Sequence, residues 1–297
     1  MSSKANIDLG LELKYVQLDD CRLAYFERGQ ASATLPTLFF VHATGFHGRI
    51  WDYHIEALPD FHCISLEQRG HGRSDKLAVD HWRTFGEDLA QVVKILGLDR
   101  VIGIGHSMGA HALVEGAHQS GAFSRLLLLD PVISAPENYQ PAVAPETSGD
   151  LHPAAKRRNK FASVDDMRDQ LRSKSAFPLF NERIFDDYCT YALEPDGEGV
   201  RLCCEPEVEA HVYMGARSNI EVFDAIRQLD IPVTIVRAQL PDPDKAMDWS
   251  GSPTWPNLWR EFPQGTEHHW DTCTHFIPMQ RPDEVIEVIR VEIDQWR

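Results

Sequence analysis

The sequence has little of what a membrane-spanning or nucleic-acid-binding protein needs. Its longest compact apolar run covers residues 126–129, far short of the roughly 18 apolar residues of a membrane-spanning helix. Its 29 lysines and arginines are outnumbered by 45 aspartates and glutamates, which gives a formal net charge of -16. A surface with this charge repels phosphate backbones. We therefore expect no membrane span and no nucleic-acid partner.

Cysteine is scarce, and its spacing does not fit a metal site. Neither C-x-x-C nor H-E-x-x-H occurs, and the glycines near residue 105 lack the G-x-G-x-x-G spacing of a dinucleotide site. Residues 1–15 carry no apolar stretch of the secretory type. We expect free buried thiols, a cytoplasmic location, no metal and no other cofactor. The six cysteines are Cys21, Cys63, Cys189, Cys203, Cys204 and Cys273.

Short apolar runs alternate with helical patterns through most of the chain, whose 297 residues suit one large core. Residues 13–18 and 22–27 predict a hairpin, and residues 283–296 predict an amphipathic last helix. Alternating strands and helices predict a parallel sheet with right-handed crossovers. The other predicted strands cover residues 37–41, 63–66, 101–105, 125–130, 233–238 and 266–270, with helices at 84–96 and 106–119.

The pattern changes between residues 132 and 227. This segment has prolines and helical stretches, the clearest at 164–173 and 184–191, but no series of strand patterns. The strand pattern returns at 233–238. We therefore predict an α/β core made of residues 1–131 and 228–297, with residues 132–227 inserted as a helical cap.

The strongest chemical motif is Gly105-His106-Ser107-Met108-Gly109, which follows a predicted strand and precedes a predicted helix. A tight strand-to-helix turn of this kind raises the serine hydroxyl above the sheet edge, near the N-terminus of the helix. The alternative is a glycine-lined turn in which the serine has no chemical role. The context favours a nucleophile.

With this motif, three further segments make the sequence resemble the capped α/β-hydrolases over nearly its whole length. They are VHATGFHGRIW at 41–51, EQRGHGRSD at 67–75 and HFIPMQRPDEV at 275–285. The resemblance implies an α/β-hydrolase fold, with a mostly parallel eight-stranded sheet flanked by helices and an inserted helical cap. It points to the serine-hydrolase, carboxylesterase-like branch and is much less specific for substrate.

The resemblance also implies the partners of Ser107. His275 carries the family's H-F-x-P pattern and would act as general base and then general acid. The carboxylate that orients this histidine has two possible places. Asp130 ends a predicted strand, whereas Asp242 and Asp244 lie after a later strand, where most relatives place the acid. Because the expected glycine of that later pattern is replaced by Ala238, we prefer Asp130.

Matching the HATGF segment to the family's HG-x-x-G loop places the oxyanion-hole donors at the backbone N–H groups of Thr44 and Met108. We expect His42 to hold this loop in shape, and His106 and His111 to have packing or supporting roles.

A basic cluster in the cap segment is a separate candidate. Arg157, Arg158 and Lys160 could contact an acidic substrate, although a solvated helix face is the preferred interpretation.

Together these features predict hydrolysis of a small or medium carboxylic ester through a Ser107 acyl-enzyme, by a monomer or homodimer. A C–C bond hydrolase, a lactonase or an acyltransferase could use the same residues. Epoxide hydrolases are disfavoured, since those relatives have aspartate in place of Ser107. A non-catalytic binding protein of the same fold is the alternative from a different class.

Overall fold

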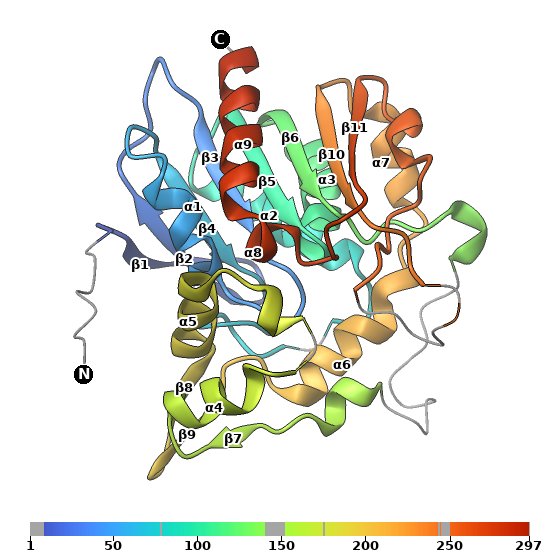
Figure 1. Ribbon diagram of the computed structural model, residues 1–297. Coiled ribbons are helices and arrows are strands. Elements are labelled where there is room, and N and C mark those ends of the chain that lie inside the picture. Colours follow the sequence, from blue (N-terminus) through green and yellow to red (C-terminus); the bar gives the residue numbers. More distant parts are fainter. Residues whose placement is uncertain are drawn as a thin grey trace.

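The computed structural model describes residues 9–77, 79–139, 152–174, 176–242, 244 and 250–296. Their central feature is an eight-stranded sheet with the order β1-β2-β4-β3-β5-β6-β10-β11 (Figure 1). Strands β1 and β2 pair antiparallel with each other, β2 pairs antiparallel with β4, and the other neighbours are parallel. The predicted mostly parallel sheet is confirmed. Its strands are β1 (Glu12–Gln17), β2 (Arg22–Arg28), β3 (Thr37–Val41), β4 (Cys63–Glu67), β5 (Val101–His106), β6 (Phe123–Leu129), β10 (Val233–Ala238) and β11 (Gly265–Trp270).

Helices cover both faces of this sheet, and a separate apolar cluster fills the space on each side. One face carries α1 (Asp52–Glu56), α8 (Ile277–Gln280) and α9 (Pro282–Trp296), which lie in front of the strands in Figure 1. The other face carries α2 (Arg83–Ile95), α3 (Met108–Ser120) and α7 (Val222–Gln228). Because both faces are covered, β3 to β6 consist almost wholly of buried residues.

Two single turns of 3-10 helix complete the core, η1 (Gly48–Trp51) and η7 (Leu258–Glu261), and a third, η2 (Pro136–Asn138), follows β6. All six cysteines are buried and unpaired, as predicted. No helix in the described ranges combines the length and the apolar character that crossing a membrane would require.

Between β6 and α7 the chain forms short helices and strands that lie below the sheet in Figure 1, at the carboxyl ends of the parallel strands. We call this part the cap segment, or cap, after the predicted insertion. Its helices are η4 (Pro153–Lys156), α4 (Val164–Leu171), η5 (Phe177–Leu179), α5 (Glu182–Tyr191), α6 (Pro206–Met214) and η6 (Gly215–Arg217). It also has a small antiparallel sheet of β7 (Lys160–Phe161), β9 (Gly199–Leu202) and β8 (Leu193–Asp196).

The expectation that the cap segment has no series of strands was therefore wrong. Its strands have only two to four residues, and β8 contains Pro195, so no alternating apolar pattern marks them. The hairpin turns at Gly197, whose φ of 62° favours glycine. The limits of the two domains at residues 131 and 228 stay a prediction.

The cap meets the core through acidic and basic side chains of α5, η1 and α1. Asp52, at the start of α1, is buried and paired with Arg49 at 2.5 Å. Asp187 of α5 has Arg183 at 3.8 Å as its ion-pair partner. Burial first, and then the negative charge of Asp52, raise the pKa of Asp187 to about 7. A partly buried carboxylate that resists ionisation thus lies where the cap joins the core.

This raised pKa makes stability depend on pH. The folded protein holds the Asp187 proton more tightly than the unfolded chain, so stability falls as pH rises from the ordinary value of 3.8 to about 7. Asp187→Asn, which resembles the protonated form, should raise Tm at pH 8 by roughly 2 °C or more. At pH 4 the variant and the parent should melt alike. Thermal denaturation of both, with the exposed Asp60→Asn as control, tests this, and a lower Tm for Asp187→Asn at pH 8 would contradict it.

Candidate active site

Ser107 occupies the sharp turn between β5 and α3. Its φ of 58° and ψ of -118° are unusual for a residue with a side chain and lift the hydroxyl away from the sheet. The two glycines of the motif are required by close packing: a Cβ on Gly109 would lie 2.4 Å from the carbonyl oxygen of Val41, and one on Gly105 would lie 2.8 Å from the backbone nitrogen of Ala110. The motif therefore forms the bend that the sequence predicts.

His275 comes to Ser107 from the far end of the chain. It lies in the loop between β11 and α8, and its Nε2 is 3.0 Å from the Ser107 hydroxyl oxygen. The backbone N–H of His275 donates a hydrogen bond to the carbonyl oxygen of Ser250 at 2.9 Å. At this distance the imidazole can accept the proton of the hydroxyl.

Asp130 directly follows β6, and its carboxylate is completely buried. One oxygen, Oδ2, accepts a hydrogen bond of 2.6 Å from Nδ1 of His275. The other oxygen, Oδ1, accepts hydrogen bonds from the backbone N–H of Ala238 at 3.0 Å and the Ser252 hydroxyl at 2.5 Å. The Thr254 hydroxyl is shared between Oδ1 at 3.1 Å and the carbonyl oxygen of Pro131 at 2.7 Å. Four donors thus surround a carboxylate that has no access to water, so both of its oxygens have hydrogen-bond partners.

Of the three candidate acids, the structure places Asp130 against His275. Asp242 accepts a hydrogen bond from the backbone N–H of Asp244 at 3.0 Å. Ser252 and Thr254 were missed by sequence reasoning. They belong to the irregular stretch between β10 and η7, where no periodic pattern indicates that two hydroxyls return to β6.

The loop after β3 and the start of α3 bring the backbone N–H groups of Thr44 and Met108 to the same region. Among the residues that the structure describes, nothing accepts a hydrogen bond from either group. The Thr44 hydroxyl donates to the sulfur of Met108 at 3.4 Å, which ties the two segments together. Two free N–H groups of this kind can stabilise a developing oxyanion.

His42 supports the loop that carries Thr44. Its Nε2 accepts a hydrogen bond from the backbone N–H of Gln68 at 3.1 Å, while the Gln68 side-chain amide donates to the His42 carbonyl at 2.9 Å. Burial lowers the pKa of His42 to about 4, so the ring is neutral and able to accept. These bonds agree with the expected supporting role.

A cavity of about 400 Å³ opens beside Thr44 and Gly45, between core and cap. Two aromatic side chains from the core and four from the cap segment line it: Phe46, Phe276, Phe177, Phe180, Tyr188 and Tyr213.

The basic cluster divides between this cavity and the surface. Arg157 lines the cavity, where it pairs with the buried Glu209 of α6 and donates to the Tyr188 hydroxyl at 3.2 Å. Arg158 and Lys160 are exposed and paired with acidic neighbours at 2.7 Å. The preferred interpretation as a solvated helix face was wrong, because Arg157 and Arg158 lie between η4 and β7 and Lys160 begins β7.

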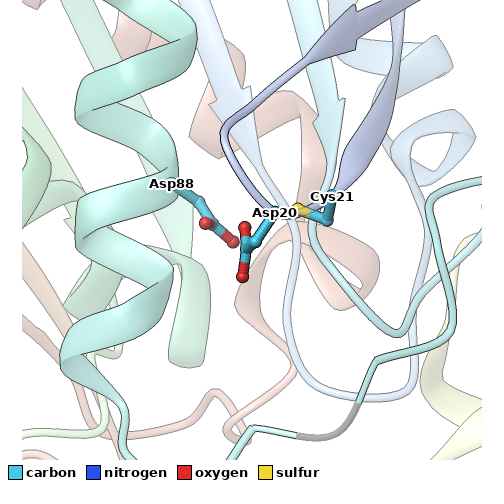
Figure 2. A group of neighbouring side chains, drawn as sticks. All are labelled: Asp20, Cys21 and Asp88. Atoms are coloured by element: carbon cyan, nitrogen blue, oxygen red, sulfur yellow. The ribbon is translucent and has the colours of Figure 1, made fainter.

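A second group of side chains has the donor types of a metal site. Figure 2 shows Asp88 of α2 directed toward Asp20, with Cys21 beside it in the turn before β2. Arg69 occupies both carboxylates, bonding Asp20 at 3.0 Å and Asp88 at 2.5 Å. Because one guanidinium bonds both carboxylates, this group fits a structural ion-pair cluster between the turn and α2.

Comparison with known proteins places this geometry in context. Residues 38–288 match the model of a family described as the alpha/beta hydrolase family. Over 120 residues, 39% of this chain and 29% of the relative, the sequence is 28% identical to epoxide hydrolase 1 of Caenorhabditis elegans. Over 100 residues it is 35% identical to the (E)-2-((N-methylformamido)methylene)succinate hydrolase of Acinetobacter baylyi, which covers 33% of this chain and 36% of that protein. The matched parts thus span about a third of the length of these curated relatives.

Similarity in three dimensions extends over the whole chain. The crystal structure of E-2-(acetamidomethylene)succinate hydrolase superposes with a TM-score of 0.74 at 20% identity and covers 96% of this chain and 99% of that one. At this identity the match shows a shared fold, and it agrees with the predicted sheet and flanking helices.

The hydroxyls on Asp130 should control the reactivity of Ser107. The combined change Ser252→Ala and Thr254→Val removes two donors from Oδ1 at nearly constant volume. It should slow covalent labelling of Ser107 by a fluorophosphonate about tenfold, roughly the effect of one charge-assisted hydrogen bond. The control is Ser120→Ala, whose hydroxyl bonds the Gly116 carbonyl at the far end of α3. Labelling at the parent rate by the double variant would contradict this role.

Proposed function

Because this chain belongs to the α/β-hydrolase family, we propose that it is a serine hydrolase that cleaves carboxylic esters through Ser107. The observation that carries the proposal is the continuous relay from the Ser107 hydroxyl through the imidazole of His275 to the buried carboxylate of Asp130. A serine hydroxyl is a weak nucleophile until such a base takes its proton.

The proposed reaction begins when the Ser107 oxygen attacks the ester carbonyl while Nε2 of His275 takes the hydroxyl proton. The backbone N–H groups of Thr44 and Met108 stabilise the negative oxygen of the tetrahedral intermediate. His275 then gives its proton to the departing alkoxide, and an acyl-enzyme remains. A water molecule, deprotonated by His275, attacks the acyl group and releases the carboxylic acid, after which the proton returns to Ser107. Asp130 keeps the imidazole oriented and stabilises its charged form throughout.

The substrate would be a small molecule that reaches Ser107 between core and cap. The aromatic lining of the 400 Å³ cavity supports an apolar acyl or alcohol part. The six unpaired thiols support the predicted cytoplasmic location. A monomer or homodimer remains our expectation.

A second candidate reaction comes from the relatives named for methylenesuccinate substrates, which are dicarboxylates. The 35% identity over 100 residues favours it. The site chemistry would be the same, with an amide-type carbonyl in place of the ester. Epoxide opening is less well supported, because the resemblance assigns aspartate, not serine, to the nucleophile of epoxide hydrolases.

Hydrolysis of p-nitrophenyl esters with acyl chains of two to twelve carbons tests the proposal. We expect activity that is highest with short chains and falls by roughly a thousandfold or more in Ser107→Ala, because the nucleophile is lost. Ser124→Ala, a change at the opposite end of the sheet, should leave the rate unchanged. Equal turnover by Ser107→Ala and the parent would rule out the nucleophile. Failure of the parent to react with either esters or a fluorophosphonate would favour the non-catalytic binding protein.

A further inference from the structure

Two of the rings that line the cavity beside Thr44 come from residues close in sequence to the proposed oxyanion-hole donor and general base. Phe46 follows Thr44 by two residues, and Phe276 follows His275 directly, with its ring centre 5.6 Å from the imidazole centre. The lining thus includes Thr44, the proposed oxyanion-hole donor, and the ring that packs against the imidazole of the proposed base.

Five of the six Phe and Tyr rings of the cavity pack against one another. Phe180 lies near parallel to Phe46 with ring centres 6.4 Å apart, and its centre is 5.2 Å from that of Phe177 and 5.5 Å from that of Phe276. The ring of Tyr188 is 5.1 Å from Phe46. Stacked and edge-to-face aromatic contacts contribute about 0.5–1.5 kcal/mol beyond the burial of apolar area. A planar aryl group thus gains more here than a saturated group of similar size.

At the polar end of the cavity the charges of Arg157 and Glu209 are paired with each other, while the third charged lining residue, Lys174, is exposed to solvent. Arg157 is paired with Glu209, and the carboxylate of Glu209 lies so close to the oxyanion loop that a Cβ on Gly45 would come within 2.7 Å of it. Burial lowers the pKa of His152, which also lines the cavity, so this ring is neutral near pH 7. A negatively charged substrate would therefore meet a guanidinium that is already neutralised and a carboxylate that repels it.

From these observations we propose that the preferred substrates are neutral esters that carry an aryl ring in the acyl or the alcohol part. This inference rests on the proposed ester hydrolysis and specifies its substrate class. It also separates this chain from relatives that are named for succinate derivatives.

Two matched pairs of esters test the preference for an aryl ring: methyl phenylacetate against methyl cyclohexylacetate, and benzyl acetate against cyclohexylmethyl acetate. In at least one pair the aromatic ester should have a kcat/KM about three- to tenfold higher, the factor that the ring contacts provide. Phe180→Leu should abolish this preference, so that the kcat/KM ratio within the pair falls to about one. Phe61→Leu, outside the cavity, is the matched control.

A second part of the test concerns the charge of the substrate. Monomethyl succinate should be a poor substrate, and Glu209→Gln, which frees Arg157, should raise its kcat/KM relative to that of methyl phenylacetate. Equal rates within both ester pairs, or good turnover of monomethyl succinate by the parent, would overturn the inference while leaving ester hydrolysis intact. If no ester reacts at all, the proposed function itself fails.

A second, independent observation concerns His106. Its Nε2–H donates a hydrogen bond of 2.8 Å to the backbone carbonyl of His275, and the two rings pack with centres 4.9 Å apart at an angle of 39°. The ring of His106 is completely buried. Since the N–H of His275 bonds to Ser250, the backbone of this loop residue is held on both sides.

The geometry points to His106 as a positioning residue that fixes His275 for proton transfer to and from Ser107. His106 does not touch the reacting atoms. Its effect would come through the orientation of the imidazole, where small displacements are costly to the rate.

His106→Phe and His106→Gln separate this role from simple packing. Phenylalanine keeps the ring but cannot donate, so kcat should fall about tenfold or more with KM within about twofold. Glutamine can donate through its amide, so it should stay within about threefold of the parent kcat. Parent-like kcat in the Phe variant, or equal losses in both, would overturn the assignment. Should no ester be turned over, the rate of fluorophosphonate labelling of Ser107 gives the same comparison without depending on the proposed substrate.

Discussion

The hydrogen bond between Asp130 and His275 joins two parts of the chain that are 145 residues apart. An ionised carboxylate without water is tolerated only when other donors surround it, and here β10 and the loop after it supply three. The end of β6, the end of β10 and the loop before α8 must therefore meet at one point of the sheet edge. The position of His275 above Ser107 follows from this meeting.

The sequence predicts the sheet and its edge well because each buried parallel strand appears as a short run of consecutive apolar residues. Residues 101–105 and 233–238 are examples. Ser107, His275 and Asp130 could be nominated from their places at strand ends and from the family resemblance. The choice of Asp130 over Asp242 needed one substitution, Ala238, in the later pattern. Because the choice of Asp130 depends on the identity of one residue in a short motif, a single sequence is enough to make it.

Other features depend on contacts between distant segments and could not be predicted. Ser252 and Thr254 are ordinary loop residues until the fold brings them to Asp130. The two- to four-residue strands of the cap carry too few side chains to show a period. Arg157 lies in a basic run that is typical of an exposed surface. It lines the cavity because it pairs with Glu209, about fifty residues later in the chain.

Two of the three non-glycine residues with positive φ in the described chain are Ser107 and Asp130. Evolution can change such positions only toward residues that tolerate a left-handed backbone, and asparagine tolerates it nearly as well as aspartate. Asp130 can thus be replaced by asparagine without a change in the backbone bend. A β-branched residue at position 107 or 130 would instead disturb the loop itself. Natural variants that have lost activity but kept the fold should therefore carry asparagine at residue 130 more often than any bulkier residue.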